Sequence, residues 1–340
     1  MNHALAMLSL LVVACGGNAG HPQPTVDASA TGRDAGDVAA SCTALAQASC
    51  NLRQSCSDGG NITHSFGDMA TCLQREALAC RLAMQAPDTG DTPDAVAACV
   101  AAYSTLGCAD FFDNNLPAAC APPGGRAAGQ ACAFASQCQS GYCGHDKTAS
   151  CGTCADPPAV GAPCRDASCF RGQICDSRTL TCVSDELAGA ACDNNTQPCG
   201  FALSCDGNSN GSFGVCTAQT GTLGESCSGT PEVNCDTKAN LSCTGPAGSR
   251  TCEIATYAAD GQPCGAQPDG NVSCAAGGEC YGAAGTIALA GAPGTCKAAA
   301  PDGAACDLEV GPPCLTPARC VVSGGGSQGV CTLPTASCGP

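Results

Sequence analysis

The stretch GQACAFASQCQSGYCGHDKTASCGTC, residues 129–154, sets the pattern for most of this chain. It opens with a Gly-x-x-Cys step, and four more cysteines follow, of which we count the first three as part of one module. The same step recurs five times further along the chain, at Gly161, Gly189, Gly224, Gly261 and Gly303. Self-similarity at a period of 20–50 residues is the signature of a repeat architecture. The sequence therefore predicts six modules of four cysteines each over residues 129–338.

The spacing within the modules separates a fixed part from a variable part. Five residues lie between the second and third cysteines in four of the six modules, whereas six to fifteen residues lie between the third and fourth. The variable segments are rich in turn-forming residues, for example SGGGSQG at 323–329. We expect short β-hairpins with variable tips. Two interpretations of the tips stay open: binding loops on a rigid frame, or unconstrained surface loops.

Composition indicates that covalent cross-links hold the chain together. Leu, Ile, Val and Phe account for 46 of 340 residues, and Trp is absent. That is below the roughly 20% at which a chain has enough large apolar side chains for a core. The 35 cysteines are then best explained as disulfides formed in an oxidising compartment. Zinc sites are the competing explanation, but the only histidines are His3, His21, His64 and His145, and we expect no metal or other cofactor.

Two cysteines of the array fall outside the count of four per module. Taking Cys132, Cys138, Cys143 and Cys151 as the first module leaves Cys154 and Cys338 without an assigned partner. Cys151-Gly-Thr-Cys154 also has the spacing of a redox motif, but such a motif needs a strand-to-helix context that lowers a thiol pKa. In this cysteine-dense setting we expect structural disulfides.

The first module resembles the Dickkopf N-terminal cysteine-rich repeat, and the others match it in the order of their cysteines. The resemblance covers about residues 129–338 at the level of spacing. Dickkopf proteins of animals are secreted antagonists of Wnt signalling, but the N-terminal segment described below makes that activity an unsuitable expectation here. What the resemblance implies is an exported array of small disulfide modules.

Residues 42–120 differ from the array because their eight cysteines lie in helical patterns. We expect Ser41 to cap a first helix, Asp68 to cap a second, and Thr92, followed by Pro93, to cap a third that stops at Gly107. Four disulfides would hold this domain, and eight cysteines allow 105 pairings. The predicted fold is thus small and disulfide-rich: a helical eight-cysteine domain followed by six short β-hairpin modules.

The N-terminus predicts export and a lipid anchor. Residues 4–14 form an apolar run that is too short to cross a bilayer but suits a secretory signal. The segment Val12-Val13-Ala14-Cys15 resembles the bacterial lipobox, which implies cleavage after Ala14 and a diacylglycerol on Cys15. Removing Cys15 from the count leaves 34 cysteines, an even number. An ordinary signal peptide is the alternative.

The segments on either side of Cys15 complete the predicted layout. Residues 1–14 are the signal peptide, and residues 15–41 are polar and rich in Gly, Pro and Ala, which predicts a disordered tether. The whole layout is similar to surface lipoproteins of the myxobacterial type. The residue after Cys15 is Gly16, whereas an Asp at this position retains some lipoproteins at the inner membrane. The resemblance therefore implies location at the outer membrane or cell surface.

Candidate sites in the array are few. Asp206, Asn208, Asn210 and Gly211 match the first half of a calcium loop, but position twelve is Thr217 instead of a bidentate glutamate. A plain hairpin turn is the preferred interpretation, and a calcium-binding adhesin is an alternative function. Lys147, central in CGHDKTASC at 143–151, would be the reactive-loop residue if the chain were a disulfide-rich protease inhibitor.

The net charge and the small number of histidines argue against several classes of function. A net charge of -16 argues against binding nucleic acid or anionic lipid by charge. A hydrolytic triad would have to use His64 or His145, which lie in different domains. We therefore expect a non-enzymatic surface module, attached to the membrane through its acyl anchor, that binds an extracellular protein or glycan or has a structural role.

Overall fold

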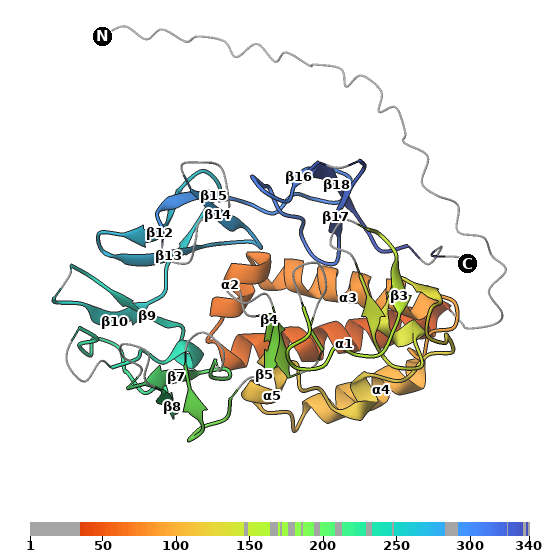
Figure 1. Cartoon of the computed structure of the whole chain (residues 1–340), viewed down its shortest axis with the longest axis horizontal. Coiled ribbons are helices and arrows are strands. Elements are labelled where there is room, and N and C mark those ends of the chain that lie inside the picture. Colours follow the sequence, from red (N-terminus) through yellow and green to blue (C-terminus); the bar gives the residue numbers. More distant parts are fainter. Residues whose placement is uncertain are drawn as a thin grey trace, which may run out of the picture. The chain divides into compact units, whose positions relative to one another are not determined.

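Helices occupy the first part of the described chain, drawn in orange and yellow in Figure 1. The computed structural model describes residues 35–145, 149–163, 169–170, 172–175, 181–184, 186–193, 198–207, 213–228, 233–246, 248–282, 292–324, 326–335 and 338. Within them the α-helices are α1 (Ala35–Cys56), α2 (Gly60–Phe66), α3 (Met69–Gln85), α4 (Pro93–Tyr103) and α5 (Cys108–Phe112). None of the helices in these ranges is both long and apolar enough to cross a bilayer.

Two of the predicted helix starts are confirmed. The carboxylate of Asp68 accepts a hydrogen bond from the main-chain N–H of Thr71 (2.7 Å), and this bond lowers the pKa of Asp68. The hydroxyl of Thr92 accepts from the N–H of Ala95 (3.2 Å), and Pro93 occupies the first turn of α4. Both caps satisfy N–H groups that the helix itself leaves unpaired.

The other two predicted boundaries are wrong. Ser41 does not cap a helix, because α1 begins at Ala35, inside the segment predicted as a tether. Asp37 in the first turn favours this start, and Val38 packs against the cluster that contains Cys42 and Met84. Gly107 does not end α4, which stops at Tyr103; it is instead the residue before α5.

The eight cysteines of the helical segment pair among themselves, as expected. Cys42–Cys80 and Cys50–Cys72 join α1 to α3, and their reversed order along the two helices is that of antiparallel neighbours. The spacing of eight residues on both helices is close to two turns, so both bridges lie on the same side of each helix. The other two pairs are Cys56–Cys108 and Cys99–Cys120.

Small antiparallel sheets follow, drawn from yellow-green to blue in Figure 1. Modules one, three and six each form a three-stranded sheet in which the strand of the first cysteine pairs with the last strand of the hairpin. These are β1 (Ala131–Cys132), β2 (Cys143–Gly144) and β3 (Gly152–Cys154); β6 (Ala191–Cys192), β7 (Leu203–Asp206) and β8 (Gly214–Ala218); and β16 (Ala305–Asp307), β17 (Arg319–Val322) and β18 (Gln328–Thr332).

Modules two, four and five vary this plan. Module two contributes a two-stranded hairpin, and modules four and five share a seven-stranded sheet. The strands are β4 (Gln173–Cys175) and β5 (Cys182–Ser184); β9 (Leu241–Thr244) and β10 (Thr251–Ile254); and β11 (Tyr257–Ala258), β12 (Pro263–Gln267), β13 (Gly270–Cys274), β14 (Glu279–Gly282) and β15 (Gly294–Lys297). Single 3-10 turns are η1 (Ala118–Cys120), η2 (Ala135–Gln137) and η3 (Thr237–Ala239). The predicted fold class is confirmed.

One pairing rule governs the modules: the first cysteine bonds to the third and the second bonds to the fourth. In module five, for example, Cys264 pairs with Cys280 and Cys274 with Cys296. Modules one, three, four and six follow the same rule, and module two shows its second-to-fourth bond, Cys169–Cys182. The third and fourth cysteines face each other across the hairpin, yet each bonds elsewhere.

This rule corrects the cysteine count of module one. Its fourth cysteine is Cys154, which bonds to Cys138, and Cys151 is the extra residue. Cys151 pairs with Cys338 over a sequence separation of 187 residues. The two cysteines that the sequence left without partners are therefore not equivalent: Cys154 belongs to its own module, whereas Cys338 ties the end of the array to the first module.

The glycine that opens each module has a conformational role. In all six it has a left-handed φ of 75° to 86°, which glycine adopts at little cost. Its N–H donates to the carbonyl of the fourth cysteine, as from Gly129 to Cys154 (2.8 Å) and from Gly303 to Cys331 (2.7 Å). The Gly-x-x-Cys step recurs because the chain must turn there to meet the hairpin.

All six modules contact the helical segment, and each does so near its second cysteine. In modules one, two, three and five the contact is a hydrogen bond: Ser136 with Gly90, Gly172 with Asp113, Phe201 with Asp113, and Gly277 with His64. In module four, Asn240 packs on Gly60. In module six, the carbonyls of Leu315 and Thr316 accept hydrogen bonds from Arg75. Helices and array together form one compact unit, Asp34–Pro340.

Two buried arginines hold distant parts of the sequence together. Arg75 of α3 makes a bidentate ion pair with Asp302 (both N–O distances 2.8 Å) and donates to the carbonyls of Leu315 and Thr316. Arg126 pairs with Asp88 (3.1 Å) and donates to the carbonyl of Cys338 (2.9 Å). Because each guanidinium has partners for its buried donors, its burial is compensated.

The pairing rule predicts the seventeenth disulfide. Cys164 lies outside the described residues, and by position it is the first cysteine of module two, so we expect it to bond to Cys175. Peptide mapping of unreduced protein by mass spectrometry checks this. A linked peptide containing both cysteines is the expected result, while a free thiol at Cys175 or a Cys15–Cys164 link would contradict it.

The Cys151–Cys338 bond should stabilise the whole unit. We expect the double variant Cys151→Ser/Cys338→Ser to lose about 2–4 kcal/mol of unfolding free energy, because the bond restricts the unfolded chain. The internal disulfides shorten the effective loop and so limit the gain. Guanidinium denaturation of wild type and variant measures the difference, and equal midpoints would show that Arg126 alone suffices to hold Cys338.

Candidate binding site

The two site residues predicted from sequence, Cys15 and Lys147, both lie outside the described residues. The ends of the loop that carries Lys147 are described: Cys143 bonds to Cys132, and Cys151 bonds to Cys338. Both ends of this loop are thus covalently fixed.

His145 lies in the same loop and is largely neutral near pH 7. Burial lowers its pKa to about 4, and the positive charge of Arg319 acts in the same direction. Its Nδ1 atom is buried and has no hydrogen-bond partner among the described residues. A neutral ring between modules one and six contributes packing there instead of charge.

The Cys151-Gly-Thr-Cys154 step is structural. Its two cysteines bond to Cys338 and Cys138, so they do not form the internal disulfide that a dithiol redox motif requires. The expectation of structural pairing is confirmed for both residues.

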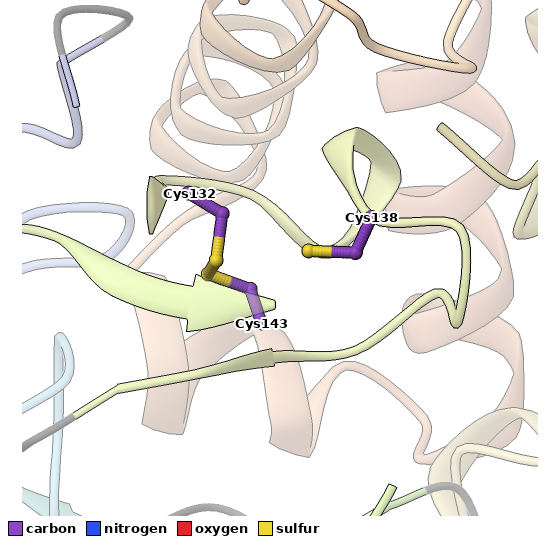
Figure 2. Close-up of side chains that lie close together, drawn as sticks. All are labelled: Cys132, Cys138 and Cys143. Carbon is purple, nitrogen blue, oxygen red and sulfur yellow. A yellow bond between two sulfur atoms is a disulfide. The ribbon is translucent and has the colours of Figure 1, made fainter. Parts of the chain in front are cut away.

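Sulfur atoms gather at the centre of each of the five modules whose four cysteines are all described. In module one, Cys132, Cys138 and Cys143 lie with their sulfurs within 4.8 Å of one another, and Figure 2 shows the Cys132–Cys143 bond with the sulfur of Cys138 directed toward it. Such a cluster resembles a thiolate metal site in geometry. All three sulfurs are in disulfides, however, and a disulfide sulfur is not a thiolate ligand. These clusters are the cores of the modules.

The suggested calcium loop lies mainly outside the described residues, since Asn208, Asn210 and Gly211 fall there. Asp206 is described, and its carboxylate already accepts hydrogen bonds from Thr217 and Asn234. The flanking strands β7 and β8 pair with Cys205 opposite Cys216, which is the geometry of the hairpin that we preferred.

A pocket of about 500 Å³ lies between the helical segment and modules three, four and five. Volumes of this order accommodate small organic ligands. The helical segment contributes side chains from α2 and from the end of α5. Modules three and four contribute side chains that follow their second cysteines, and module five contributes Tyr257 and Ser273, which precede its second cysteine. The lining residues used below are Ser57, Asn61, His64, Phe112, Asp113, Phe201, Asn240, Tyr257 and Ser273.

The polar groups of the pocket are positioned by hydrogen bonds. The Tyr257 hydroxyl donates to the Asn240 side-chain carbonyl (2.9 Å). Nδ1 of His64 is 2.8 Å from the carbonyl oxygen of Cys274, so the proton must be on Nδ1. The Asn61 side-chain carbonyl accepts from the Arg53 guanidinium (3.1 Å), whose charge is also paired with Glu76. The polar tips are therefore held in fixed orientations.

Aromatic rings supply the apolar part of the lining. Phe112 stacks on Phe201 with their centroids 4.3 Å apart. The rings of His64 and Tyr257 lie 6.0 Å apart at an interplanar angle of 34°. These pairs join the helical segment to modules three and five, so the same contacts that dock the modules also build the pocket.

Gly60 allows Asn240 and Tyr257 to approach α2. A Cβ atom at Gly60 would lie 2.8 Å from the Tyr257 hydroxyl oxygen and closer still to the Asn240 side chain, both too short for a real contact. Asn240 itself has a left-handed backbone (φ 53°), which asparagine tolerates better than most residues. Close packing at this wall of the pocket thus depends on two particular residue types.

Asp113 is the one carboxylate among the described lining residues. Burial raises the pKa of Asp113, while the hydrogen bond from the N–H of Phe201 (2.8 Å) lowers it and the nearby charge of Asp110 raises it. Raised acid pKa values are typical of functional sites, although ordinary packing also produces them.

Sequence analysis did not find this pocket. Among its residues only His64 was considered, as a possible catalytic base, and the structure bonds its Nδ1 to a main-chain carbonyl. The others come from six separate segments that no spacing rule connects. The positive φ of Asn240 and the buried Gly60 are signals that only coordinates reveal.

The raised pKa of Asp113 predicts that Asp113→Asn increases the free energy of unfolding, by an amount that depends on pH. As the pH rises from 3.8, the ordinary pKa, through the raised pKa, Asp113 loses its proton more readily in the unfolded chain than in the folded one. The folded wild-type protein therefore loses stability over this pH range. The amide keeps an oxygen for the Phe201 N–H and carries no charge. The variant should therefore exceed wild type in stability at pH 7 and match it near pH 3 by denaturant titration; lower stability of the variant at pH 7 would contradict the raised pKa.

Comparisons with known proteins give no relative from which a role could be transferred: no protein-family model, no curated protein and no solved structure matches this chain.

Proposed function

We propose that this chain is a bacterial surface lipoprotein whose disulfide-stapled ectodomain binds an external ligand without catalysing a reaction. The fold supports an exported protein, because sixteen described disulfides are stable only in an oxidising environment. The observation that carries the binding role is the pocket between α2, α5 and modules three to five, whose walls are fixed by cross-linked segments.

The cysteine count supports an anchor at Cys15. Thirty-two cysteines are in described disulfides, and Cys164 with Cys175 completes the repeat pattern, which leaves Cys15 alone. Together with the lipobox-like Val12-Val13-Ala14, this favours acylation over a role in the disulfide framework. Location at the outer membrane or cell surface, and a relation of the array to Dickkopf-like repeats, belong to the same proposal.

The chemistry of the pocket supports binding over catalysis. His64 uses its Nδ1 proton on a main-chain carbonyl, and Asp113 accepts from a main-chain N–H. No hydroxyl or thiol nucleophile is hydrogen-bonded to His64 in the part of the chain that the structure describes. Nucleophilic catalysis requires a base within hydrogen-bond reach of its nucleophile.

Protease inhibition is a second candidate, and one observation favours it. The loop that contains Lys147 is fixed at both ends by Cys132–Cys143 and Cys151–Cys338, and inhibitors of this class present a loop held in one conformation. Inhibition of a trypsin-like protease at micromolar protein, abolished by Lys147→Ala, would establish this activity. No inhibition by wild type would remove it.

The anchor is tested by Cys15→Ser in the producing bacterium. We expect wild type in the membrane fraction with an acyl mass on the N-terminal cysteine. The variant should leave that fraction, because the protein then lacks its acyl chains. Fractionation with immunoblotting and intact-mass spectrometry are the measurements, and protease treatment of whole cells reports surface exposure.

The control is the double variant Cys151→Ser/Cys338→Ser, which also loses cysteines but keeps Cys15. It should fractionate with wild type. Wild-type protein that is found in the soluble fraction, without acyl mass on Cys15, would refute the anchor.

A further inference from the structure

We propose that the pocket between α2, α5 and modules three to five binds a neutral, hydroxyl-rich ligand, that is, part of a glycan, through Asn61, His64, Asn240 and Tyr257. This inference rests on the proposed binding function and specifies its ligand class. It follows from which hydrogen-bonding atoms of the pocket are already used and which are not.

The unused atoms include both donors and acceptors. The Tyr257 hydroxyl donates its hydrogen bond to the side-chain carbonyl of Asn240. The Tyr257 oxygen therefore remains as an acceptor, and the amide NH₂ of Asn240 remains as a donor. Asn61 uses its carbonyl on Arg53 and keeps its NH₂. The Nδ1 proton of His64 is used on the Cys274 carbonyl, which leaves Nε2 as the acceptor atom of this ring. Among the described residues these atoms have no other hydrogen-bond partner.

A hydroxyl group matches this mixed set of amide, phenol and imidazole atoms because it donates and accepts at the same time. Several hydroxyls on one ring can satisfy neighbouring amide donors and phenol or imidazole acceptors together. Ser273 adds a further hydroxyl to the same walls, whereas the Ser57 hydroxyl already donates to the Arg53 carbonyl and accepts from the Asn61 N–H. The rings of Tyr257 and His64 provide apolar surface for the C–H groups of a sugar, as mixed pockets generally do.

Charge argues against the other small-ligand classes. No Lys or Arg is among the residues that line the described pocket, so a phosphate or sulfate would lack a countercharge there. For an organic cation the pocket offers one carboxylate, Asp113, and one of its oxygens is already bound by the Phe201 N–H. A neutral ligand avoids the desolvation cost of either charge.

The site is preorganised, which lowers the entropic cost of binding. Cys199 itself lines the pocket and is bonded to Cys216, and Ser273 precedes Cys274, which is bonded to Cys296. On the helical side, Ser57 follows Cys56, which is bonded to Cys108. Three walls are thus within one residue of a disulfide, and a ligand has little loop motion to freeze.

The test uses full-length wild-type protein on an array of neutral cello-, chito- and malto-oligosaccharides. Sulfated oligosaccharides and uncharged peptides are spotted as separate arms, and isothermal titration calorimetry quantifies the best binder. We expect binding to a neutral oligosaccharide. Tyr257→Phe, which keeps the ring and removes the hydroxyl, should weaken it about five- to tenfold, and Asn61→Ala by a similar factor.

The matched control is Asn271→Ala, which removes an exposed side-chain amide outside the pocket and should leave affinity unchanged. Circular dichroism and unreduced mass confirm that each variant is folded and fully bridged. The inference is overturned if no neutral oligosaccharide binds at about 1 mM, if Tyr257→Phe and Asn61→Ala bind like wild type, or if only the peptide or sulfated arm binds. An acylated surface protein that binds no sugar would refute this inference alone, whereas sugar binding by a protein without an acyl chain would refute only the anchor.

Discussion

Each module depends on the crossed pairing of its four cysteines. The two cysteines that face each other across a hairpin do not bond together; one reaches back to the first cysteine and the other to the second. Two adjacent disulfides therefore clamp the hairpin onto the segment before it, and the buried sulfurs take the place of a hydrocarbon core. In a chain with so few large apolar side chains, this arrangement is what compensates for the entropy of ordering the backbone.

Features set by local chemistry were predictable, and features set by distant contacts were not. Asp68 and Thr92 cap their helices because the capping bond spans only three residues. Ser41 is not a cap because Val38, four residues before Cys42, packs against the cluster of Cys42, Cys80 and Met84. This contact extends the helix toward the N-terminus, to Ala35. In module one the third-to-fourth spacing fits Cys151 as well as Cys154. The structure separates the two through the Cys138–Cys154 bond, the position of Cys154 opposite Cys143, and the hydrogen bond from Gly129 to the Cys154 carbonyl.

The same distinction explains why the pocket was missed. Its residues are ordinary in sequence: an asparagine after a cysteine, a tyrosine between modules, a histidine on a short helix. They meet because modules three to five dock on α2 and α5, and docking is a property of surfaces that no local pattern encodes. Arg75 is a further case, since no local pattern in the sequence indicates its partners, and the structure buries it against Asp302 and two carbonyls.

Docking also gives a physical reason for the unequal cysteine spacings. The contacts to the helical segment come from residues around or just after the second cysteine, such as Phe201, Asn240, Gly277 and Thr316. That segment must reach a fixed surface and return to the third cysteine, so its length is nearly constant. The segment between the third and fourth cysteines only closes a hairpin, and loop closure costs little extra as a loop grows. Length constancy therefore marks the face of each module that binds the helices, and a ligand site formed at that face inherits its rigidity.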